Sequence, residues 1–404
     1  METLRKRTVK VLTLTHVFPR THEDAVAPFL WNYHEAVAHL GVEYVVLAPH
    51  QAGLSPCEKQ GTWHVQRFQY APEKWERLAY TGQMHELVLK NLWNKVLFGA
   101  YMATCFFKLC RILRKERFDL VHVHWWIPSG FIMYLASFFH RTPYVITTHG
   151  TDVFILKKFP LLTHIARPVF KKAARVQTIS TYVQDLTMNM FSLPARKTLR
   201  IPMPIREEQF PLSPPRFYGG TKLLCIGRLI KRKGVHVLVE SLALLPPEYE
   251  LTIVGTGPEE TSLSEQMKRL KVEHRIRHIR QLSPKDLSTI MGESDIFILP
   301  SLTDWKGETE GLGMVLLEAQ RMGLALIASN SGGMTDIVIH EETGFLFPEG
   351  ESNALAQQIT RYRCQDTHRA MVEGAQKRYE HFYSRTAIAE QTYAMYQDIC
   401  SHGE

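Results

Sequence analysis

Short apolar runs alternate with longer amphipathic stretches along most of the chain. Residues 9–15 have the pattern of a strand, residues 28–40 have helical spacing, and residues 44–48 are apolar again. Further strand-like runs in the first half span residues 120–123, 144–148 and 175–179. Near-continuous Val, Ile and Leu strands separated by helices are typical of a parallel sheet that is covered on both faces. The pattern therefore predicts an α/β fold.

The second half repeats this pattern after a break. Its strand-like runs span residues 222–226, 251–254, 276–279, 296–299 and 325–329. The break, residues 209–220, holds three prolines and a Gly-Gly pair, which favour neither helix nor central strand. We predict two doubly wound, Rossmann-like domains at 1–208 and 221–375, joined by this linker, with a helical segment at 376–404 that packs back on the first domain. Parallel sheets bind ligands beyond the carboxyl ends of their strands, so we expect the site in a cleft that both sheets face.

Composition places the chain among folded proteins, since 45% of its 404 residues are hydrophobic and 22% are charged. No apolar run approaches the ~20 residues that span a bilayer, and the longest one considered, residues 131–139, is far too short. The basic start continues into a strand-like run and lacks a signal-peptide core. The six cysteines form no C-x-x-C pair, which favours reduced thiols. We expect a cytoplasmic protein.

The excess positive charge lies in one half. Up to residue 212 there are 27 Lys and Arg against 15 Asp and Glu, a balance of +12, whereas the remainder carries 21 against 25, a balance of −4. A basic first half favours an anionic partner there. Nucleic acid is a poor candidate, because the charge is not interleaved with aromatic residues in any recognition motif.

The densest group of chemically useful residues follows the run 296–299. Glu310 precedes Gly311, Leu312 and Gly313, and we expect a helix to begin near Gly311. Amides freed at a helix N-terminus favour an anion such as a diphosphate. Glu318 would lie about two turns into that helix, where its carboxylate could accept from vicinal hydroxyls. A capped helix with a solvated Glu is the alternative.

A basic loop follows the run 222–226. Arg228 and Lys233 could clamp a phosphate chain, and Gly227 allows close approach of the backbone. Arg228 is the safer assignment, because Lys231 and Arg232 compete for any role given to Lys233. A basic loop that is merely solvated remains an alternative.

Histidines follow two strands of the first half. His149 and Asp152 come directly after residues 144–148, where the site is expected. A structural histidine is the alternative. His122 and His124 alternate along a strand, so we expect only one of them to face any ligand, and no carboxylate or cysteine completes a metal site with them.

The order of motifs resembles a known enzyme family. G-R-L-x-x-x-K-G (227–234) is followed by V-G-x-G-P (254–258), E-G-x-G-x-x-x-x-E (310–318), S-G-G-x-x-D (331–336) and T-G-F-L-F (343–347). This series is similar to that of the retaining nucleotide-sugar glycosyltransferases of family four, which have the GT-B fold. It covers the second domain, and the first domain is similar in outline.

The resemblance implies a role for each of these residues. Arg228 and Lys233 would hold the diphosphate and stabilise it as leaving group, assisted by the amides of Gly311 to Gly313. Glu318 would bind the ribose, Glu310 would contact the donor sugar, and His149 would lie beside that sugar. Gly227 and Asp152 would be further donor-binding residues. The co-substrate would be a nucleotide diphosphate-sugar, and no other cofactor is expected.

Two positions depart from the family pattern. The first loop, residues 18–28, lacks the Gly-Gly found in many members, and Asp336 replaces a glutamate. There is also no Asp-x-Asp, which fits a metal-independent reaction that uses Arg and Lys in place of a cation.

An acceptor at or near a membrane is the final expectation. Residues 75–118 form a long helical stretch of aromatic and aliphatic residues with a basic end, and residues 153–160 with Lys171 and Lys172 repeat that mixture. Such a face could bind to anionic lipid on the inner side of the membrane. A core helix with a solvated basic end is the alternative. The expected acceptor is a lipid-linked or surface glycan.

Three other functions are considered. A GT-B type sugar-nucleotide epimerase would need the donor but no acceptor. A basic nucleic-acid-binding protein without catalysis is a more distant possibility. Rossmann-type hydride transfer is poorer still, because Gly255 and Gly257 lack the third glycine of that fingerprint.

Overall fold

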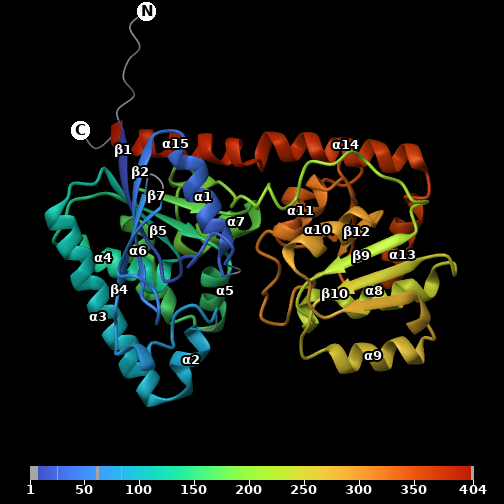
Figure 1. Cartoon of the computed structure of the whole chain (residues 1–404), viewed down its shortest axis with the longest axis horizontal. Helices are drawn as coiled ribbons and strands as arrows, with labels where there is room; N and C mark the ends of the chain where they lie inside the picture. Colours follow the sequence, from blue (N-terminus) through green and yellow to red (C-terminus); the bar gives the residue numbers. More distant parts are fainter. Residues whose placement is uncertain (1–7, 25, 61–62, 83, 402–404) are drawn as a thin grey trace, which may run out of the picture. The chain divides into compact units, whose positions relative to one another are not determined.

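The computed structural model describes residues 8–401 apart from residues 25, 61–62 and 83. The chain forms two compact units, each built around one sheet (Figure 1). The first unit comprises Met1–Ile179, Val183–Pro204 and Arg385–Glu404, and the second comprises Ser180–Tyr182 and Ile205–Ser384. The expected boundary at 375/376 falls inside one helix, which belongs to the second unit.

The first unit holds an eight-stranded sheet in the order β3-β4-β2-β1-β5-β6-β7-β8. All neighbouring strands are parallel except β3, which runs antiparallel to β4 at the edge. The strands are β1 (Val9–Leu14), β2 (Val42–Pro49), β3 (Cys57–Gln60), β4 (Trp63–Phe68), β5 (Leu120–His124), β6 (Tyr144–Thr148), β7 (Arg175–Thr178) and β8 (Thr198–Arg200).

Helices cover both faces of this sheet. They are α1 (Pro28–Ala38), α2 (Met84–Lys90), α3 (Leu92–Lys115), α4 (Phe131–Ala136), α5 (Thr151–Lys158), α6 (Leu162–Lys172), α7 (Thr181–Phe191) and α15 (Arg385–Ser401). Val121 and Val123 share a buried core with residues of α3, α4 and α6. On the other face Tyr396 of α15 lies 2.5 Å from the Nδ1 atom of His122. The alternation of strand side chains thus decides which helices each residue meets.

The expectation that only one of His122 and His124 faces a ligand is wrong. The two rings stack with their centroids 4.6 Å apart, on the face opposite Val121 and Val123. Side chains two residues apart in a strand point to the same face, so both imidazoles lie side by side. Both are buried.

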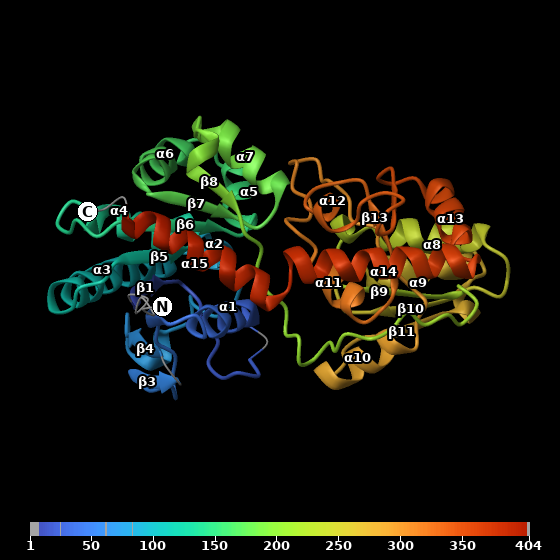
Figure 2. The same ribbon diagram turned by 90° about the horizontal axis from the view of Figure 1, so that it is seen from above.

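The second unit holds a six-stranded, fully parallel sheet in the order β11-β10-β9-β12-β13-β14 (Figure 2). Its strands are β9 (Lys222–Ile226), β10 (Glu250–Val254), β11 (Ile276–Ile279), β12 (Ile296–Leu299), β13 (Ala325–Ser329) and β14 (Phe345–Phe347). Its helices are α8 (Val235–Leu244), α9 (Glu260–Arg269), α10 (Pro284–Gly292), α11 (Met314–Arg321), α12 (Met334–Ile337), α13 (Ser352–Arg361) and α14 (Gln365–Phe382). The prediction of two doubly wound parallel α/β sheets is confirmed.

The expectation that no segment is long and apolar enough to span a bilayer is wrong for α3. By length and composition, this described helix is long and apolar enough to cross a membrane. Its inner face, however, packs in the core of the first unit through Leu97, Tyr101, Cys105 and Leu109. Isolated lysines, such as Lys95, interrupt the apolar pattern and hide the helix from a search for unbroken apolar runs.

Candidate donor site and first-unit histidine cluster

Two loops of the second unit meet where its strand order reverses. The central strand β9 has β10 on one side and β12 on the other, so β9 and β12 flank the topological switch point. Loops after strands at such a point are where doubly wound sheets bind ligands. The loop after β9 carries Arg228 and Lys233, and the loop after β12 carries Glu310. The fold therefore brings together the two segments that the sequence singled out separately.

A partly buried ion pair joins the two loops. The Nζ atom of Lys233 donates to Oε2 of Glu310 at 2.6 Å, and a guanidinium nitrogen of Arg232 lies 3.7 Å from the same oxygen. Burial by itself would raise the pKa of Glu310, but the charge and hydrogen bond of Lys233, aided by Arg232 and Ser301, lower that pKa overall. Glu310 is thus an anion held by two cations at neutral pH.

Glycines allow these loops to press together. A Cβ on Gly234, whose φ is +64°, would lie 1.8 Å from the carbonyl oxygen of Pro300 at the end of β12. A Cβ on Gly333 would lie 2.1 Å from the carbonyl oxygen of Gly311, and the Gly333 amide donates to the Glu310 carbonyl at 2.9 Å. No larger residue fits either position without moving backbone. The S-G-G motif therefore positions the turn that carries Glu310.

The turn after Glu310 presents backbone amides. The helix α11 begins at Met314, three residues later than expected, because Gly313 adopts a left-handed conformation with φ of 84° as its N-cap. Within the described residues, the amides of Gly311, Leu312 and Gly313 donate to no recorded acceptor. An anion such as a phosphate is well matched by free amides at the positive end of a helix.

Glu318 lies on the second turn of α11. It is half-buried, and in the part of the chain that the structure describes no side chain pairs with its carboxylate. Burial raises its pKa to about 8. The structure shows no contact between Glu318 and Glu310. An unpartnered, half-buried carboxyl of this kind can accept hydroxyl hydrogens from a ligand.

Arg228 differs from Lys233 in being exposed. Among the described residues its guanidinium forms no recorded ion pair, whereas Lys233 is held by Glu310. A Cβ on Gly227 would contact the aliphatic part of Lys233 at 3.6 Å, so Gly227 lies beneath the lysine stem. Among the described residues of this loop, Arg228 and Lys231 are therefore the exposed cations without a recorded ion pair, and Arg228 has the forked guanidinium that suits a phosphate.

The first unit gathers aromatic and imidazole rings at its own switch point. The strand order reverses at β1, which lies between β2 and β5. His16 follows β1 and Trp125 follows β5, and their rings meet edge to face with centroids 4.4 Å apart. His149, which follows β6, stacks on Trp125 at 4.0 Å. Trp125 has an unusual φ of 64°, which is costly for a residue with a side chain and is typical of functional sites.

The imidazoles of this cluster are neutral. Burial lowers the pKa of His149 to about 3 and that of His16 to about 4. The Nε2 atom of His149 lies 3.1 Å from Nδ1 of His124, and burial lowers the pKa of His124 well below its usual value. A neutral His149 can donate or accept one hydrogen bond but carries no charge toward a ligand.

Asp152 is turned toward the backbone of its own unit. Its carboxylate accepts hydrogen bonds from the amides of His149, at 3.0 Å, and Trp126, at 3.3 Å. Burial raises its pKa to about 6 in spite of these bonds, which act in the opposite direction. These contacts fix the turn that carries His149. Donor binding by Asp152 stays a prediction.

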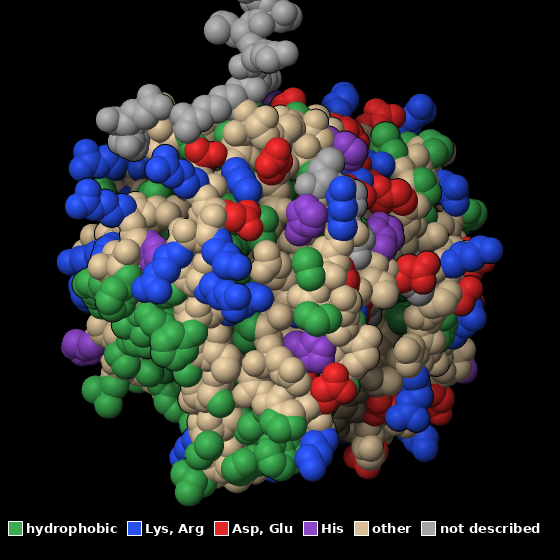
Figure 3. All heavy atoms as spheres, turned by 60° about the vertical axis from the view of Figure 1, so that its left-hand side comes forward, with side chains coloured by type: hydrophobic (Ala, Val, Ile, Leu, Met, Phe, Trp, Pro, Cys, Tyr) green, Lys and Arg blue, Asp and Glu red, His purple; other side chains and the backbone are tan. Residues whose placement is uncertain are grey.

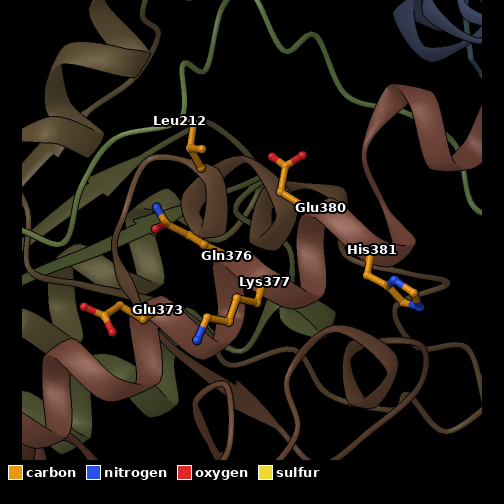
Figure 4. Close-up of a pocket in the computed structure, with 6 residues that line it drawn as sticks. All are labelled: Leu212, Glu373, Gln376, Lys377, Glu380 and His381. Atoms are coloured by element: carbon orange, nitrogen blue, oxygen red, sulfur yellow. The ribbon is translucent and has the colours of Figure 1, made fainter.

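A pocket elsewhere in the second unit is a poor match for this chemistry. It has a volume of about 630 Å³ and lies along α14 (Figure 4). Its lining residues are Leu212, Glu373, Gln376, Lys377, Glu380 and His381. It contains none of the predicted site residues. Among the described residues, no group of three or more His, Cys, Asp or Glu side chains is placed to hold a metal ion.

The structure thus separates the predicted site residues into two groups. In the second unit, Lys233 contacts Glu310 directly, and the remaining predicted residues lie on the same two loops and on α11. In the first unit, His149 and Asp152 form one turn. Sequence reasoning missed His16 and Trp125, and it named Arg232 only as a competitor for the role of Lys233. The sequence shows Arg232 beside Lys233 but does not tell which of the two contacts Glu310. The contact of His16 with Trp125 depends on strand order, so no local sequence pattern predicts it.

Comparison with protein families covers most of the chain. Residues 25–204 match the model described as "Glycosyl transferase 4-like domain", and residues 212–378 match "Glycosyl transferases group 1". The chain is 26% identical over 332 residues to the N-acetyl-alpha-D-glucosaminyl L-malate synthase of Bacillus anthracis, covering 78% of this chain and 84% of that protein. It is 31% identical over 172 residues to the amylovoran biosynthesis glycosyltransferase AmsK of Erwinia amylovora, covering 42% of each.

A solved structure shares the fold. The Anabaena protein HepE, in complex with UDP-glucose, matches with a TM-score of 0.67 and 18% identity, over 96% of this chain and 99% of that one. Together with the two family models, this likeness confirms the GT-B fold expected from the motifs. The chain belongs to the group 1, 4-like glycosyltransferases, a retaining family of GT-B fold, and it is a glycosyltransferase.

Proposed function

We propose that this enzyme transfers a sugar, with retention, from a uridine diphosphate-sugar to a glycan or lipid-linked saccharide acceptor in the cytoplasm. The observation that carries the donor half is the ion pair of Lys233 and Glu310, set beside free amides and an unpaired arginine at the switch point of the second unit. HepE binds UDP-glucose, and AmsK is an amylovoran biosynthesis enzyme, which supports the choice of base and of acceptor class.

The diphosphate is the part of the donor that these groups recognise. The amides of Gly311 to Gly313 and the guanidinium of Arg228 bind its oxygens, and Lys233 adds a positive charge nearby. During transfer the bond from the anomeric carbon to the diphosphate oxygen breaks, and negative charge grows on the leaving group. Fixed donors and cations that are already in place stabilise this charge without reorganising.

The two glutamates have different tasks because their surroundings differ. Glu310, ionised by its pairing with Lys233, accepts hydrogen bonds from sugar hydroxyls and keeps the lysine directed at the site. Glu318 has no such partner and accepts from the ribose hydroxyls. In the same-face displacement the acceptor oxygen bonds to the anomeric carbon while its proton passes to the departing diphosphate.

A thermal-shift screen of nucleoside diphosphates and their sugars tests the donor. We expect UDP and a UDP-sugar to raise the melting temperature of the full chain. Arg228→Ala should lose that shift, and the matched control Lys231→Ala, in the same loop, should keep it. No shift with any nucleotide, or equal shifts for both variants, would contradict the donor assignment.

The acceptor half needs a separate assay. Turnover of the donor found in the screen should rise on adding a lipid-linked or soluble oligosaccharide, and the product should carry the new sugar in the configuration of the donor. Release of UDP with an epimerised sugar and no acceptor requirement would instead indicate an epimerase.

A further inference from the structure

The helix α3 carries apolar residues on two opposite faces. Its inner face is part of the first-unit core, where Tyr101 contacts the rings of Phe68 and Tyr70 at 5.0 and 5.3 Å. Its outer face exposes Leu92, Val96, Ala103 and Phe107 at intervals of four or seven residues, which puts them on one stripe. A helix that is apolar all round is normally covered all round. In the described part of the chain nothing covers this stripe.

Other segments extend the stripe into a surface patch. The ring of Phe106 contacts Phe107 on α3 and Phe139 in the turn after α4. Phe107, Phe138 and Phe139 are 69%, 62% and 69% exposed. At the other end of α3, Trp93 meets Trp75 at 5.4 Å, and both are exposed. Figure 3 views this side of the molecule and shows hydrophobic side chains gathered beside Lys and Arg. We call these residues, with the α3 stripe, the α3 patch.

Cations surround the α3 patch. Arg111 follows Phe107 by one helical turn, and Arg114 and Lys115 end the helix; all three are exposed. The Nζ atom of Lys172 on α6 lies 4.0 Å from the ring centroid of Phe138. Acids are few on this side: residues 87–115 contain none and residues 120–184 contain only the buried Asp152, while Glu73 and Glu86 are exposed toward the Trp75 end. A partner for this surface must therefore be apolar where it meets the rings and anionic at its border.

We propose that the α3 patch docks on the surface of an anionic phospholipid bilayer, with α3 lying in the plane of the membrane. Aromatic side chains enter the boundary between headgroups and acyl chains, and the arginines and Lys172 meet lipid phosphates. Tryptophans such as Trp75 and Trp93 are suited to this interface because they are amphipathic. Docking would thereby bring the enzyme, which uses a soluble donor, to a saccharide acceptor carried by a membrane lipid.

The helix docks on the bilayer but does not cross it. Spanning would remove Leu97, Tyr101, Cys105 and Leu109 from the first-unit core and leave one face of the sheet uncovered. The buried face of α3 is thus already used, and only the outer face is available to lipid. This distinguishes the proposal from the transmembrane reading that length and composition of α3 permit.

Vesicle flotation of the full chain tests the proposal. We expect binding to phosphatidylglycerol-containing vesicles, little binding to pure phosphatidylcholine, and loss of binding in high salt or alkaline carbonate. The double variant Phe107→Gln with Phe139→Gln should partition at least about tenfold more weakly, because each ring loses its burial in the bilayer. The double variant Arg111→Gln with Lys172→Gln should weaken binding roughly thirtyfold, with the apolar contacts retained.

Controls separate lipid docking from loss of fold and from other partners. Leu244→Gln, at an exposed apolar position of the second unit, should bind vesicles like the native chain. Each variant should also keep the native melting temperature and its shift with nucleotide. The proposal is overturned if both double variants bind vesicles as tightly as the native chain, or if the native chain binds no vesicle. Insertion that resists carbonate, or self-association that the phenylalanine variant abolishes, would also overturn it. Because the assay uses neither donor nor acceptor, its failure is distinct from failure of the proposed function.

Discussion

The two units place different chemistry at equivalent points of their sheets. In each, loops meet where the strand order reverses. In the second unit the meeting side chains are charged, with Lys233 and Arg232 around Glu310. In the first unit they are neutral rings, with Trp125 between His16 and His149. Burial acts on both, but only the second unit supplies opposite charges that keep its carboxylate ionised.

Under the proposed function, this difference assigns different parts of the reaction to the two units. A diphosphate carries negative charge that increases as it leaves, so it belongs with cations and free amides. A sugar ring is neutral, with hydroxyls and apolar faces, and rings and uncharged imidazoles suit it. The second unit should thus dominate donor affinity and turnover, while substitutions in the first unit should have smaller effects. Substitutions in the two units should therefore rank by the charge that each one removes.

Removing the carboxylate of Glu310 should have the largest effect. In Glu310→Ala we expect turnover to fall about a thousandfold. The hydroxyls of the donor sugar lose a hydrogen-bond acceptor, and Lys233 loses the carboxylate that directs it toward the site. Steady-state assays with the identified donor measure this. Glu308→Ala, on the same loop, is the matched control and should stay near the native rate. Turnover above a tenth of native in a folded Glu310→Ala variant would remove Glu310 from the catalytic machinery.

Arg228→Ala should lower turnover roughly a hundredfold, since one stabilising cation at the leaving group is lost while the amides and Lys233 remain. Arg228→Lys should recover only part of the loss, because a lysine lacks the two-pronged guanidinium geometry. The comparison of kcat with KM shows whether the loss is in the transition state. Full activity of Arg228→Ala would show that this exposed arginine is merely solvated.

His149→Ala should slow transfer by roughly tenfold to thirtyfold, the range expected for one neutral hydrogen bond and its packing. The contribution of His149 should not change between pH 5 and 8, because its pKa of about 3 keeps the ring neutral throughout. The ratio of native to variant rates across this pH range measures it. A ratio that rises or falls steeply near pH 6 or 7 would mean that His149 acts as a titrating acid or base.

Glu318 should make nucleotide affinity depend on pH. With a pKa of about 8 the group is mostly protonated at pH 7, whereas the ribose hydroxyls are best accepted by the ionised form. Affinity should therefore rise with pH, by about tenfold between pH 7 and pH 9 if only the carboxylate binds. Calorimetry of UDP binding measures this, and Glu318→Gln should lack the dependence. An identical pH profile in that variant would contradict the ribose role.

Asp152→Asn should produce the smallest change, a few-fold in turnover and about 1 kcal/mol in stability, because one amide of the turn loses its acceptor. The folded-state pKa of about 6 lies above the ordinary value of 3.8, so this group favours the folded state most below pH 4 and loses that contribution as pH rises through 6. The melting-temperature difference between native and variant should therefore shrink from pH 4 to pH 7. A constant difference would place the pKa of Asp152 near its ordinary value.

Much of the architecture could be predicted because its signals are local. Apolar runs such as residues 296–299, each followed by polar loop residues, gave the parallel strands and the edge at which ligands bind. The turn around Glu310 was recognisable because glycines and carboxylates adjoin there in sequence. Likewise, the basic loop after β9 was evident from composition alone.

The remaining features depend on contacts between distant residues or on geometry. The choice of Lys233 as partner of Glu310 follows from the short helical turn Lys231–Lys233, which composition does not specify. The cluster of His16 with Trp125 exists because β1 pairs with β5. The helix itself was predicted within residues 75–118, but its span-like length was missed because lysines interrupt the apolar runs.

The most direct test of donor binding at the second-unit switch point is calorimetric titration of the full chain with UDP, comparing the native protein with Arg228→Ala and Lys231→Ala. We predict that Arg228→Ala binds UDP at least about tenfold more weakly while Lys231→Ala, three residues away in the same loop, binds like the native protein. Equal affinity of all three proteins, or equal weakening by both substitutions, would contradict it.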